Sequence, residues 1–559
     1  MLDEIKRNIE EQIKACLSIP VVLEKGKIEG AGDFAFPVFH VAKESGGNPA
    51  DIALQIAAKL SSIKIKFVKE VKAIGPYVNI WLDWNVLGKK LMADINEKYG
   101  KKKRCRKNVV IDYCSPNPAH PLHIGTLRST LIGESLSRIF SWCGFDVKRI
   151  CYINDLGWQA AVLLFGYKKF GRGARPKGKE DVWLGNIYMK TNAELEHNKA
   201  LEKQVSEILQ AYENNDRKTR ALGKKVFGWC IDGFKKTWDV LGIKFDDIIY
   251  ENRFVEDGRK ITQELKRKGL LFESEGALIL RLEPELPNTV FIRSDGTGLY
   301  MTRDLPFTIY KYKKWKPYRN IYVVGEDQKM HFRQMFNVLK RMGYEQIANS
   351  SVHVAYSMVS LEGKKMSARR GTMVLWDDLY EQCRKKAFDE VKRRWPALTQ
   401  KEARSRGDAI ALATIKYYIL KYAPEKPVNF VMDIAMRFEG DTGPYLQYTY
   451  ARASSILSKG KKIKRHSPLL LKEKEEIELM KCLAEFPDAC ELCCQQYSPH
   501  YLCTYLYMLA DSFNRFYERI PVLKAEEKER ASRLRLVAAV RTVLGIGMNL
   551  LGIDRIEKM

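Results

Sequence analysis

Hydrophobic positions in the first hundred residues follow helical spacing twice and strand-like alternation once. The opening stretch MLDEIKRNIEEQIKACLSIP and the later NPADIALQIAAKL are predicted helices, and YVNIWL alternates as a strand does. The segment GDFAFPVFHVAK lies between the two helices, and the basic run KYGKKKRCRK follows the strand. Residues 1–105 are therefore predicted to form an N-terminal α+β domain. The basic run is either a solvated linker or a contact for a phosphate backbone.

The middle of the chain alternates short apolar runs with helical spacing. NVVIDYCSPN is a predicted strand that breaks into a proline-containing loop, and a helix follows with apolar residues at Leu127, Leu131, Leu136, Ile139 and Phe140. Further strands are predicted in VKRICYIND, NIYVVG and VHVAYSMVSL, with helices in LPFTIYKYKKW and MHFRQMFNVLKRMG. This alternation predicts a Rossmann-like, doubly wound parallel α/β domain over residues 106–376, with an insertion at about 165–290.

Beyond residue 376 the pattern is almost wholly helical, as the spacing of Ile410, Ala413, Tyr417 and Leu420 shows. We predict a helical connective region over residues 377–438 and an all-helical domain over residues 439–559. A chain of 559 residues is too long for one core, because a domain usually has roughly 100 to 200 residues. The fold class is therefore multidomain α/β.

The net charge of the chain indicates what kind of partner it binds. Lys and Arg number 95 against 68 Asp and Glu, which gives a net charge of +27 at pH 7. Solubility alone needs a net charge of only about 2 to 8 in a small domain, so a large anionic partner is favoured. Nucleic acid is the preferred partner, and an anionic membrane surface is the competing one.

The chain has no run of about 18 apolar residues, and its first helix lacks the apolar core of a signal peptide, so we expect a cytoplasmic protein without membrane contact. Twelve scattered cysteines are expected to be reduced thiols. Cys490, Cys493 and Cys494 lie near His500, but ordinary buried thiols are favoured over zinc there, and no structural metal is predicted.

The tetrapeptide His123-Ile124-Gly125-Thr126 stands at the start of the helix that follows the first predicted strand of the α/β domain. Backbone N–H groups and the positive helix end favour a triphosphate there. Gly125 permits a nucleotide ring to approach closely, and His123 can donate to developing phosphate charge. Taken alone, the tetrapeptide is better explained as a histidine that caps a helix by chance.

The segment KKMSARRG, residues 364–371, follows the strand VHVAYSMVSL and the turn Glu362-Gly363. Four cations on a glycine-bounded loop suit a clamp on the β- and γ-phosphates, where negative charge develops on departing pyrophosphate. A solvated charged hairpin is the alternative.

In this order the two segments resemble the HIGH and KMSKS signatures of class I aminoacyl-tRNA synthetases. The surrounding residues resemble the arginyl enzymes of that class, and the resemblance extends over nearly the whole chain to the terminal GIDRIEKM. Its other elements are Ser115-Pro116-Asn117, Leu127-Arg128-Ser129-Thr130, Asn154-Asp155 with Gly157 and Gln159, Tyr300 and Asp304 in LYMTRDLPFTIYK, Gln328 in VVGEDQKMHF, and FEGDTGPYLQYTYARASSIL.

The resemblance implies an arginine–tRNA ligase that uses ATP with Mg²⁺ to form arginyl-adenylate from L-arginine and then esterifies the terminal ribose of tRNA(Arg). It also implies attack by the 2′-hydroxyl and activation that requires bound tRNA. We expect a monomer. The implied catalytic residues are His123 and Lys365, and the implied ATP-binding residues are His120, His123, Gly125, Thr126, Lys365, Met366 and Ser367. The implied arginine-binding residues are Ser115, Pro116, Asn117, Asn154, Tyr300, Asp304 and Gln328.

Physical chemistry supports the arginine assignment independently. A guanidinium has five donors and no acceptor, so a selective pocket needs a carboxylate. Asp304 can supply it, with Tyr300 one helical turn earlier and Gln328 as a neutral acceptor. Alone, Asp304 would be read as a helix N-terminal cap.

The C-terminal domain resembles the part of arginyl enzymes that binds the anticodon region, the connective region resembles the stem contact, and the N-terminal domain resembles the part that contacts the tRNA corner. Aromatic rings and donors can read unpaired bases by stacking and hydrogen bonds, although core aromatic residues would show the same pattern. The candidate tRNA-binding residues are Phe34, Phe36, Tyr77, Tyr501, Tyr505, Asn514, Arg515, Tyr517 and Met559.

Two positions depart from the signatures. Thr126 stands in place of the second histidine, and Ala368 in place of a second lysine, where Arg369 or Arg370 could substitute. Two rival functions therefore stay open at this point. One is a nucleotidyltransferase that adenylylates a small cofactor, and the other is a catalytically silent RNA-binding protein.

Overall fold

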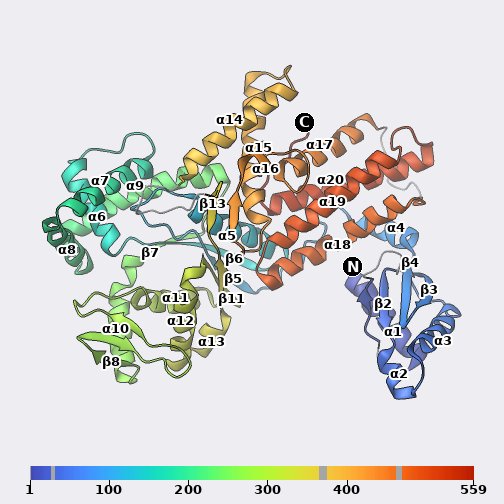
Figure 1. Ribbon diagram of the computed structural model, residues 1–559, viewed down its shortest axis with the longest axis horizontal. Coiled ribbons are helices and arrows are strands. Elements are labelled where there is room, and N and C mark those ends of the chain that lie inside the picture. The colour runs from blue at the N-terminus through green and yellow to red at the C-terminus, as the bar shows by residue number, and fades with distance from the viewer. Residues whose placement is uncertain (1, 20, 27–31, 364–373, 461–468) are drawn as a thin grey trace.

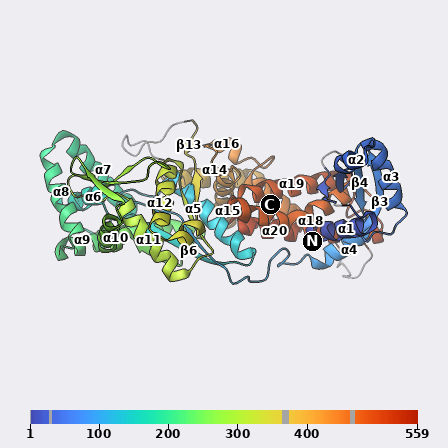
Figure 2. The same cartoon turned by 90° about the horizontal axis from the view of Figure 1, so that it is seen from below.

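The structure is a computed structural model that describes residues 2–19, 21–26, 32–363, 374–460 and 469–559. The molecule is elongated, with the helices of residues 158–241 at one end and the N-terminal domain at the other (Figures 1 and 2). The parallel sheet lies between them, and the C-terminal helices run from this sheet toward the N-terminal domain.

The N-terminal domain is α+β, as the sequence predicts. Its four-stranded antiparallel sheet has the order β1–β2–β4–β3. The two predicted helices and the strand YVNIWL are confirmed as α1, α3 and β4. The elements are α1 (Leu2–Leu17), β1 (Glu24–Lys25), β2 (Phe34–Pro37), α2 (Phe39–Ser45), α3 (Pro49–Ser61), β3 (Val68–Ile74), β4 (Tyr77–Leu82) and α4 (Trp84–Asp94).

A five-stranded parallel sheet forms the centre of the next domain, with the order β7–β6–β5–β11–β12. Its strands are β5 (Asn108–Asp112), β6 (Asp146–Ile153), β7 (Asp247–Tyr250), β11 (Arg319–Gly325) and β12 (Ser351–Tyr356). Beginning at β5, the chain first extends the sheet through β6 and β7 and then returns to the other side of β5 with β11 and β12. Such a reversal of strand order leaves a crevice at the carboxyl ends of the strands, where ligands bind in doubly wound folds.

The predicted doubly wound domain is confirmed, with two differences from the sequence prediction. The strand β7 belongs to the central sheet although it lies inside the stretch predicted as an insertion, because DIIY is too short and too mixed in polarity to stand out. The apolar run VHVAYSMVSL is also not one strand. It divides into β12 and β13 (Val359–Leu361), and β13 pairs in parallel with β14 (Val428–Phe430) instead of joining the sheet.

Helices cover the sheet and extend beyond it. A small antiparallel sheet with the order β10–β9–β8 lies beside them. These elements are α5 (Ile124–Trp142), α6 (Trp158–Gly166), η1 (Tyr167–Gly171), α7 (Glu180–His197), α8 (Ala200–Glu213), α9 (Arg217–Leu241), η2 (Glu251–Phe254), α10 (Val255–Arg267), β8 (Leu271–Ser274), β9 (Ala277–Leu280), β10 (Thr289–Ile292), α11 (Met301–Trp315), η3 (Glu326–Gln328), α12 (Lys329–Arg341) and α13 (Glu345–Ser350).

The C-terminal region is helical except for the short β14, in agreement with the periodicity. Its helices are α14 (Trp376–Arg394), α15 (Gln400–Leu420), α16 (Met432–Ala435), α17 (Gly443–Lys459), α18 (Lys474–Gln496), α19 (His500–Arg519) and α20 (Glu527–Leu550). Cys490 and Cys493 are buried within α18, where burial raises the pKa of both thiols. None of the helices that the structure describes has the length and apolar character needed to cross a membrane.

Helix α5 connects these parts. It is buried along most of its length, because one side packs on β5 and β6 and the other meets α15, α18 and α20. A helix covered on several sides needs close approach at particular positions. Gly133 provides it, since a Cβ atom there would lie 2.2 Å from Cγ of Tyr113.

Replacement of Gly133 by Ala should lower the free energy of unfolding by about 1 to 3 kcal/mol, because the added methyl group forces helix and tyrosine apart. Urea unfolding followed by circular dichroism measures the effect. Gly228→Ala is the matched control, since a Cβ atom at this position of α9 meets nothing within 4 Å. It should raise stability by about 0.5 to 1 kcal/mol through the helix preference of alanine. Equal behaviour of the two variants would contradict the close packing of α5.

Candidate active site

A cavity of about 310 Å³ opens at the carboxyl ends of the parallel strands, where their order reverses. Asp112 ends β5, Asn154 follows β6, and Gly325 ends β11. The cavity brings together a large share of the residues predicted from the sequence, namely Ser115, Thr126, Asn154, Tyr300, Asp304 and Gln328. Pro116 and Asn117 belong to the same loop as Ser115 but do not line the cavity.

Asp304 lies in the first turn of α11 and lines the cavity. Its Oδ2 lies 2.7 Å from Nε2 of His331 on α12. Tyr300, whose side chain is largely exposed, occupies the cap position of that helix without a capping side-chain bond. The alternative interpretation of Asp304 as the cap is therefore not supported, because the carboxylate bonds to a side chain of another helix.

Two further carboxylates of the cavity are buried beside cations. Asp112 accepts a hydrogen bond from Nζ of Lys311 at 2.7 Å, and burial raises the pKa of Asp112 and lowers that of Lys311. Glu251 accepts from Nε of Arg303 at 2.7 Å, and burial raises the pKa of Glu251 to about 7 against the effect of the guanidinium. Of the three carboxylates, Asp304 thus has a histidine in place of a lysine or arginine as its partner among the described residues.

At the N-terminus of α5, His123 is the cap, and its Nδ1 accepts from the backbone N–H of Gly125 at 3.1 Å. The ring proton therefore resides on Nε2, which lies 3.0 Å from Oγ1 of Thr126. Burial and, to a smaller extent, nearby His120 lower the pKa of His123 to about 4. At neutral pH His123 is consequently an uncharged donor at a helix end.

The loop between β5 and α5 is held by side-chain amides. Oδ1 of Asn117 accepts from the backbone N–H of Ala119 at 2.9 Å, and its Nδ2 donates to Oε1 of Gln159 at 2.7 Å. The ring of His120 meets that of Tyr188 edge-on at 4.7 Å, and burial lowers the pKa of His120. Asn117 and His120 therefore act on the shape of this loop in the structure.

The predicted residues Lys365, Met366 and Ser367 lie outside the described residues. The chain on either side of them is described. It leaves β13 through Glu362 and Gly363 and reappears at Val374. Val374 lies next to the start of α5, because its carbonyl oxygen accepts from the N–H of Ile124 at 3.1 Å.

The candidate tRNA-binding residues divide by exposure. The rings of Phe34, Phe36 and Tyr505 fill hydrophobic cores, so they cannot stack on a base. Asn514 is also buried, and its amide bonds to Tyr445, Thr449 and Arg452 inside the helical domain. The more accessible candidates are Tyr77, Tyr501, Arg515, Tyr517 and Met559.

The parallel sheet, the crevice at its strand reversal and a histidine-capped helix fit the catalytic domain of a class I aminoacyl-tRNA synthetase, and the family comparison identifies that class. Residues 89–430 match the family model described as tRNA synthetases class I (R), catalytic domain. Residues 446–559 match the DALR anticodon binding domain, and residues 3–82 match the arginyl tRNA synthetase N terminal domain. The chain belongs to the arginyl-tRNA synthetase family, whose members are arginine–tRNA ligases.

Individual relatives agree over nearly the full length. The chain is 36% identical to the arginine–tRNA ligase of Treponema denticola, with 94% of this chain and 93% of the relative covered. It is 34% identical to that of Halothermothrix orenii, with 99% and 97% covered. The solved structure of Thermus thermophilus arginyl-tRNA synthetase is 27% identical, covers 100% of both chains and superimposes with a TM-score of 0.84.

Sequence reasoning missed several residues that the cavity contains. Asp112, Glu251 and Tyr152 are buried at strand ends, and His331 comes from α12. The signal for Asp112 was present, since it is the acidic residue that ends an apolar strand. Glu251 had no such signal because β7 was not recognised, and nothing in the sequence pairs His331 with Asp304.

The pKa of Glu251 leads to a testable pH dependence. Above pH 7 its carboxylate is ionised and balances the charge of Arg303, whereas below pH 7 it is protonated and leaves that buried guanidinium uncompensated beside the cavity, where it repels a cationic ligand. The dissociation constant for arginine should therefore rise about tenfold from pH 8 to pH 6, as measured by titration calorimetry. Glu251→Gln should bind arginine weakly at both pH values and lose this dependence. A wild-type affinity that is constant over the range would contradict the prediction.

Proposed function

We propose that the cavity binds L-arginine and that the chain joins it to tRNA(Arg) in two steps. The arginine carboxylate attacks the α-phosphorus of ATP to give arginyl-adenylate and pyrophosphate, and the terminal 2′-hydroxyl of the tRNA then attacks the arginyl carbonyl, forming the ester and releasing AMP. The observation that carries this proposal is that Asp304 lines the cavity without a lysine or arginine partner among the described residues. The buried Asp112 and Glu251 have Lys311 and Arg303 as partners, whereas Asp304 contacts a histidine.

A guanidinium fits this arrangement. Oδ2 of Asp304 is bonded to Nε2 of His331, which leaves Oδ1 to accept from the ligand, since no bond of Oδ1 occurs among the described residues. The exposed ring of Tyr300 is positioned at the same helix end and offers a face to the planar cation. Glu251, paired with Arg303, lines the same cavity.

The amino-acid end of arginine would be held by the polar residues of the cavity. Ser115 and Asn154 follow β5 and β6, so they lie near the end of α5 where the reaction takes place. Gln328 donates from Nε2 to Asp327, which leaves its amide oxygen as a neutral acceptor. Pro116 and Asn117 contribute by shaping the loop that carries Ser115.

The ATP site is proposed at the N-terminus of α5. The positive end of the helix dipole attracts phosphate there, and neutral His123 supplies a donor beside the hydroxyl of Thr126. That hydroxyl partly replaces the second histidine of the signature. Lys365, with Met366 and Ser367, is proposed to stabilise the departing pyrophosphate, and His120 supports the loop.

Magnesium would reach the site on the ATP phosphates, where it neutralises their charge. Three carboxylates of the cavity have lysine, arginine or histidine partners, and Asp327 accepts from the amide of Gln328. This acidic lining suits a cationic amino acid.

Transfer RNA is proposed to contact three regions. The N-terminal domain offers Tyr77, and the connective region 377–438 would meet the stem. The helical domain offers Tyr501, Arg515, Tyr517 and Met559. Tyr517 has the guanidinium of Arg452 5.1 Å from its ring centre, a pairing suited to an unpaired base. The charge of +27 supports a polyanionic partner.

We further propose a monomer in the cytoplasm, which accords with twelve unpaired thiols.

The activity is tested by arginine-dependent exchange of pyrophosphate into ATP, with and without tRNA(Arg). Exchange that needs arginine and tRNA together supports the proposal. Exchange that arginine does not stimulate under either condition contradicts it.

Asp304→Asn should reduce kcat/KM for arginine by roughly thirty- to several-thousand-fold, because half of a desolvated ion pair is lost at a cost of about 2 to 5 kcal/mol. Binding of ATP and of tRNA should stay within a few-fold of wild type. Citrulline, which has a neutral urea end, should be rejected less strongly by the variant than by wild type. Pyrophosphate exchange with each amino acid measures kcat/KM for arginine and for citrulline. Equilibrium binding assays measure the affinities for ATP and for tRNA.

The control is Asp327→Asn, which removes one charge from the exposed rim of the same cavity and keeps an acceptor for Gln328. It should alter kcat/KM by less than about fivefold, since exposed charges are screened by water. Similar losses in the two variants would mean that the overall charge of the cavity, and not the contact with Asp304, selects arginine.

Lys365→Ala should lower the rate of activation by roughly two to three powers of ten, or about 3 to 4 kcal/mol, because the lost charge acts on departing pyrophosphate. Arginine affinity, measured by calorimetry, should be nearly unchanged. Lys364→Ala removes the same charge one residue earlier and should have a much smaller effect. Weakened arginine binding with a normal rate in Lys365→Ala would overturn the assigned role.

A further inference from the structure

One buried cation of α5, Arg128, has no role in the mechanism proposed above. Its side chain is 0% exposed, and it lies about one turn beyond the His123 end of the helix. Its guanidinium donates to four backbone carbonyl oxygens. Nη1 reaches Ser357 at 2.6 Å and Met358 at 3.4 Å, and Nη2 reaches Ala423 at 3.1 Å and Lys426 at 2.6 Å.

This arrangement is a costly way to gain stability. A buried charge is normally balanced by a charge of opposite sign, and burial without one is unfavourable. Among the described residues Arg128 has no carboxylate in ion-pair contact, and burial lowers its pKa to about 10. The planar guanidinium instead fixes a distance, because it joins two pairs of carbonyl oxygens from separate segments at a set spacing.

The two segments lead into the paired strands β13 and β14. Ser357 and Met358 precede β13, and the turn from Ala423 to Lys426 precedes β14. The segments also bond to each other, since the N–H of Ser357 donates to Pro424 and the N–H of Val428 donates to Met358. Arg128 therefore fixes the start of β13, and β13 leads within a few residues to Lys365.

The far side of the Lys365 segment is attached to the same helix by the backbone. The N–H of Ile124 donates to Val374 at 3.1 Å, and the N–H of Trp376 donates to Leu122 at 2.9 Å. Both ends of the chain around Lys365 thus meet the first two turns of α5. On the C-terminal side of the Lys365 segment, at Val374 and Trp376, the contact is made by strand-like backbone hydrogen bonds. On its N-terminal side, at the start of β13, which we call the entrance, the contact is made by the Arg128 side chain.

We propose that Arg128 is a positioning residue that holds the entrance of the Lys365 segment at a fixed place relative to the His123 end of α5. The inference rests on the role proposed for Lys365. Arg128 does not line the cavity that contains Asp304 and Glu251, so its loss acts on the use of ATP and spares amino-acid binding. Misplacement of a reacting group by about 1 Å can cost roughly a hundredfold in rate.

The test begins with Arg128→Lys, which keeps the charge but lacks the fork that spans both carbonyl pairs. In arginine-dependent pyrophosphate exchange with tRNA(Arg), kcat should fall by roughly a hundredfold. The dissociation constant for arginine, measured by calorimetry, should stay within about threefold of wild type. An unchanged kcat, or an equal loss of arginine affinity, would overturn the proposal.

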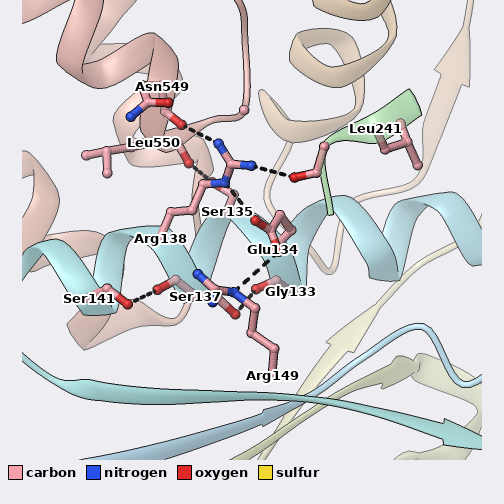
Figure 3. A network of polar contacts seen from close by, with 12 residues as sticks. Gly133, Glu134, Ser135, Ser137, Arg138, Ser141, Arg149, Leu241, Asn549 and Leu550 are labelled. Atoms are coloured by element: carbon pink, nitrogen blue, oxygen red, sulfur yellow. Dashed lines mark hydrogen bonds and ion pairs between the residues drawn. The ribbon is translucent and has the colours of Figure 1, made fainter. Parts of the chain in front are cut away.

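Arg138→Lys is the matched control. Arg138 lies on the same helix and also donates to backbone carbonyls, at 2.9 Å to Asn549 and at 2.9 Å to Gly242, and its Nε bonds to Glu134 (Figure 3). These contacts tie α5 to the ends of α20 and α9 and not to β13. Arg138→Lys should lower the thermal midpoint as Arg128→Lys does, yet leave kcat within about threefold of wild type. A comparable loss of kcat in both variants would identify a general packing effect.

A double-mutant cycle separates positioning from folding. If Arg128 acts through Lys365, Arg128→Lys should change kcat by less than about threefold once Lys365→Ala is present. Losses that multiply, or a Lys365→Ala variant with normal activity, would overturn the inference. Wild-type protein that shows no arginine-dependent exchange would instead refute the proposed function, so the two failures are distinguishable.

Discussion

The burial of α5 is the constraint on which the rest of the structure depends. Because sheet and helices cover this helix on several sides, its polar side chains are satisfied by other segments of the chain. Arg128 donates to carbonyl oxygens that precede β13 and β14, and Arg138 donates to carbonyl oxygens at the ends of α9 and α20. Glu134 accepts from the hydroxyl of Tyr113. The helix whose N-terminus is the proposed phosphate site is therefore also the element on which the catalytic domain and the C-terminal helices meet.

The cavity follows a related electrostatic rule. Low solvent access makes each carboxylate expensive to ionise, and the chain balances Asp112 and Glu251 with Lys311 and Arg303. Asp304 differs, since its partner is the histidine ring of His331 and not a lysine or arginine. In the proposed function a cationic ligand completes the set of ion pairs, and the carboxylate of Asp304 selects the guanidinium.

The differences between expectation and structure have physical causes. β7 escaped recognition because four residues of mixed polarity give no clear period, yet they complete the sheet and bring Glu251 to the cavity. The continuous run VHVAYSMVSL predicted a single strand, but Arg128 and the turn before β14 draw its second half away from the sheet. Phe34, Phe36 and Tyr505 were candidates for stacking on bases, and they fill cores instead, because an aromatic ring has the same periodicity in both roles.

The sequence by itself determined the fold class, the order of the domains and the family, since these depend on local periodicity and on motifs read along the chain, and it made Asp304 a candidate for the arginine site. The tertiary structure alone decided which partner each buried charge has. Asp304 and His331 are separated by an intervening strand, and Arg128 meets carbonyls almost 300 residues away, with separations of 229 to 298 residues. Pairings of this kind leave no local signal, because a buried cation or histidine is chosen for partners that only folding brings within hydrogen-bond distance.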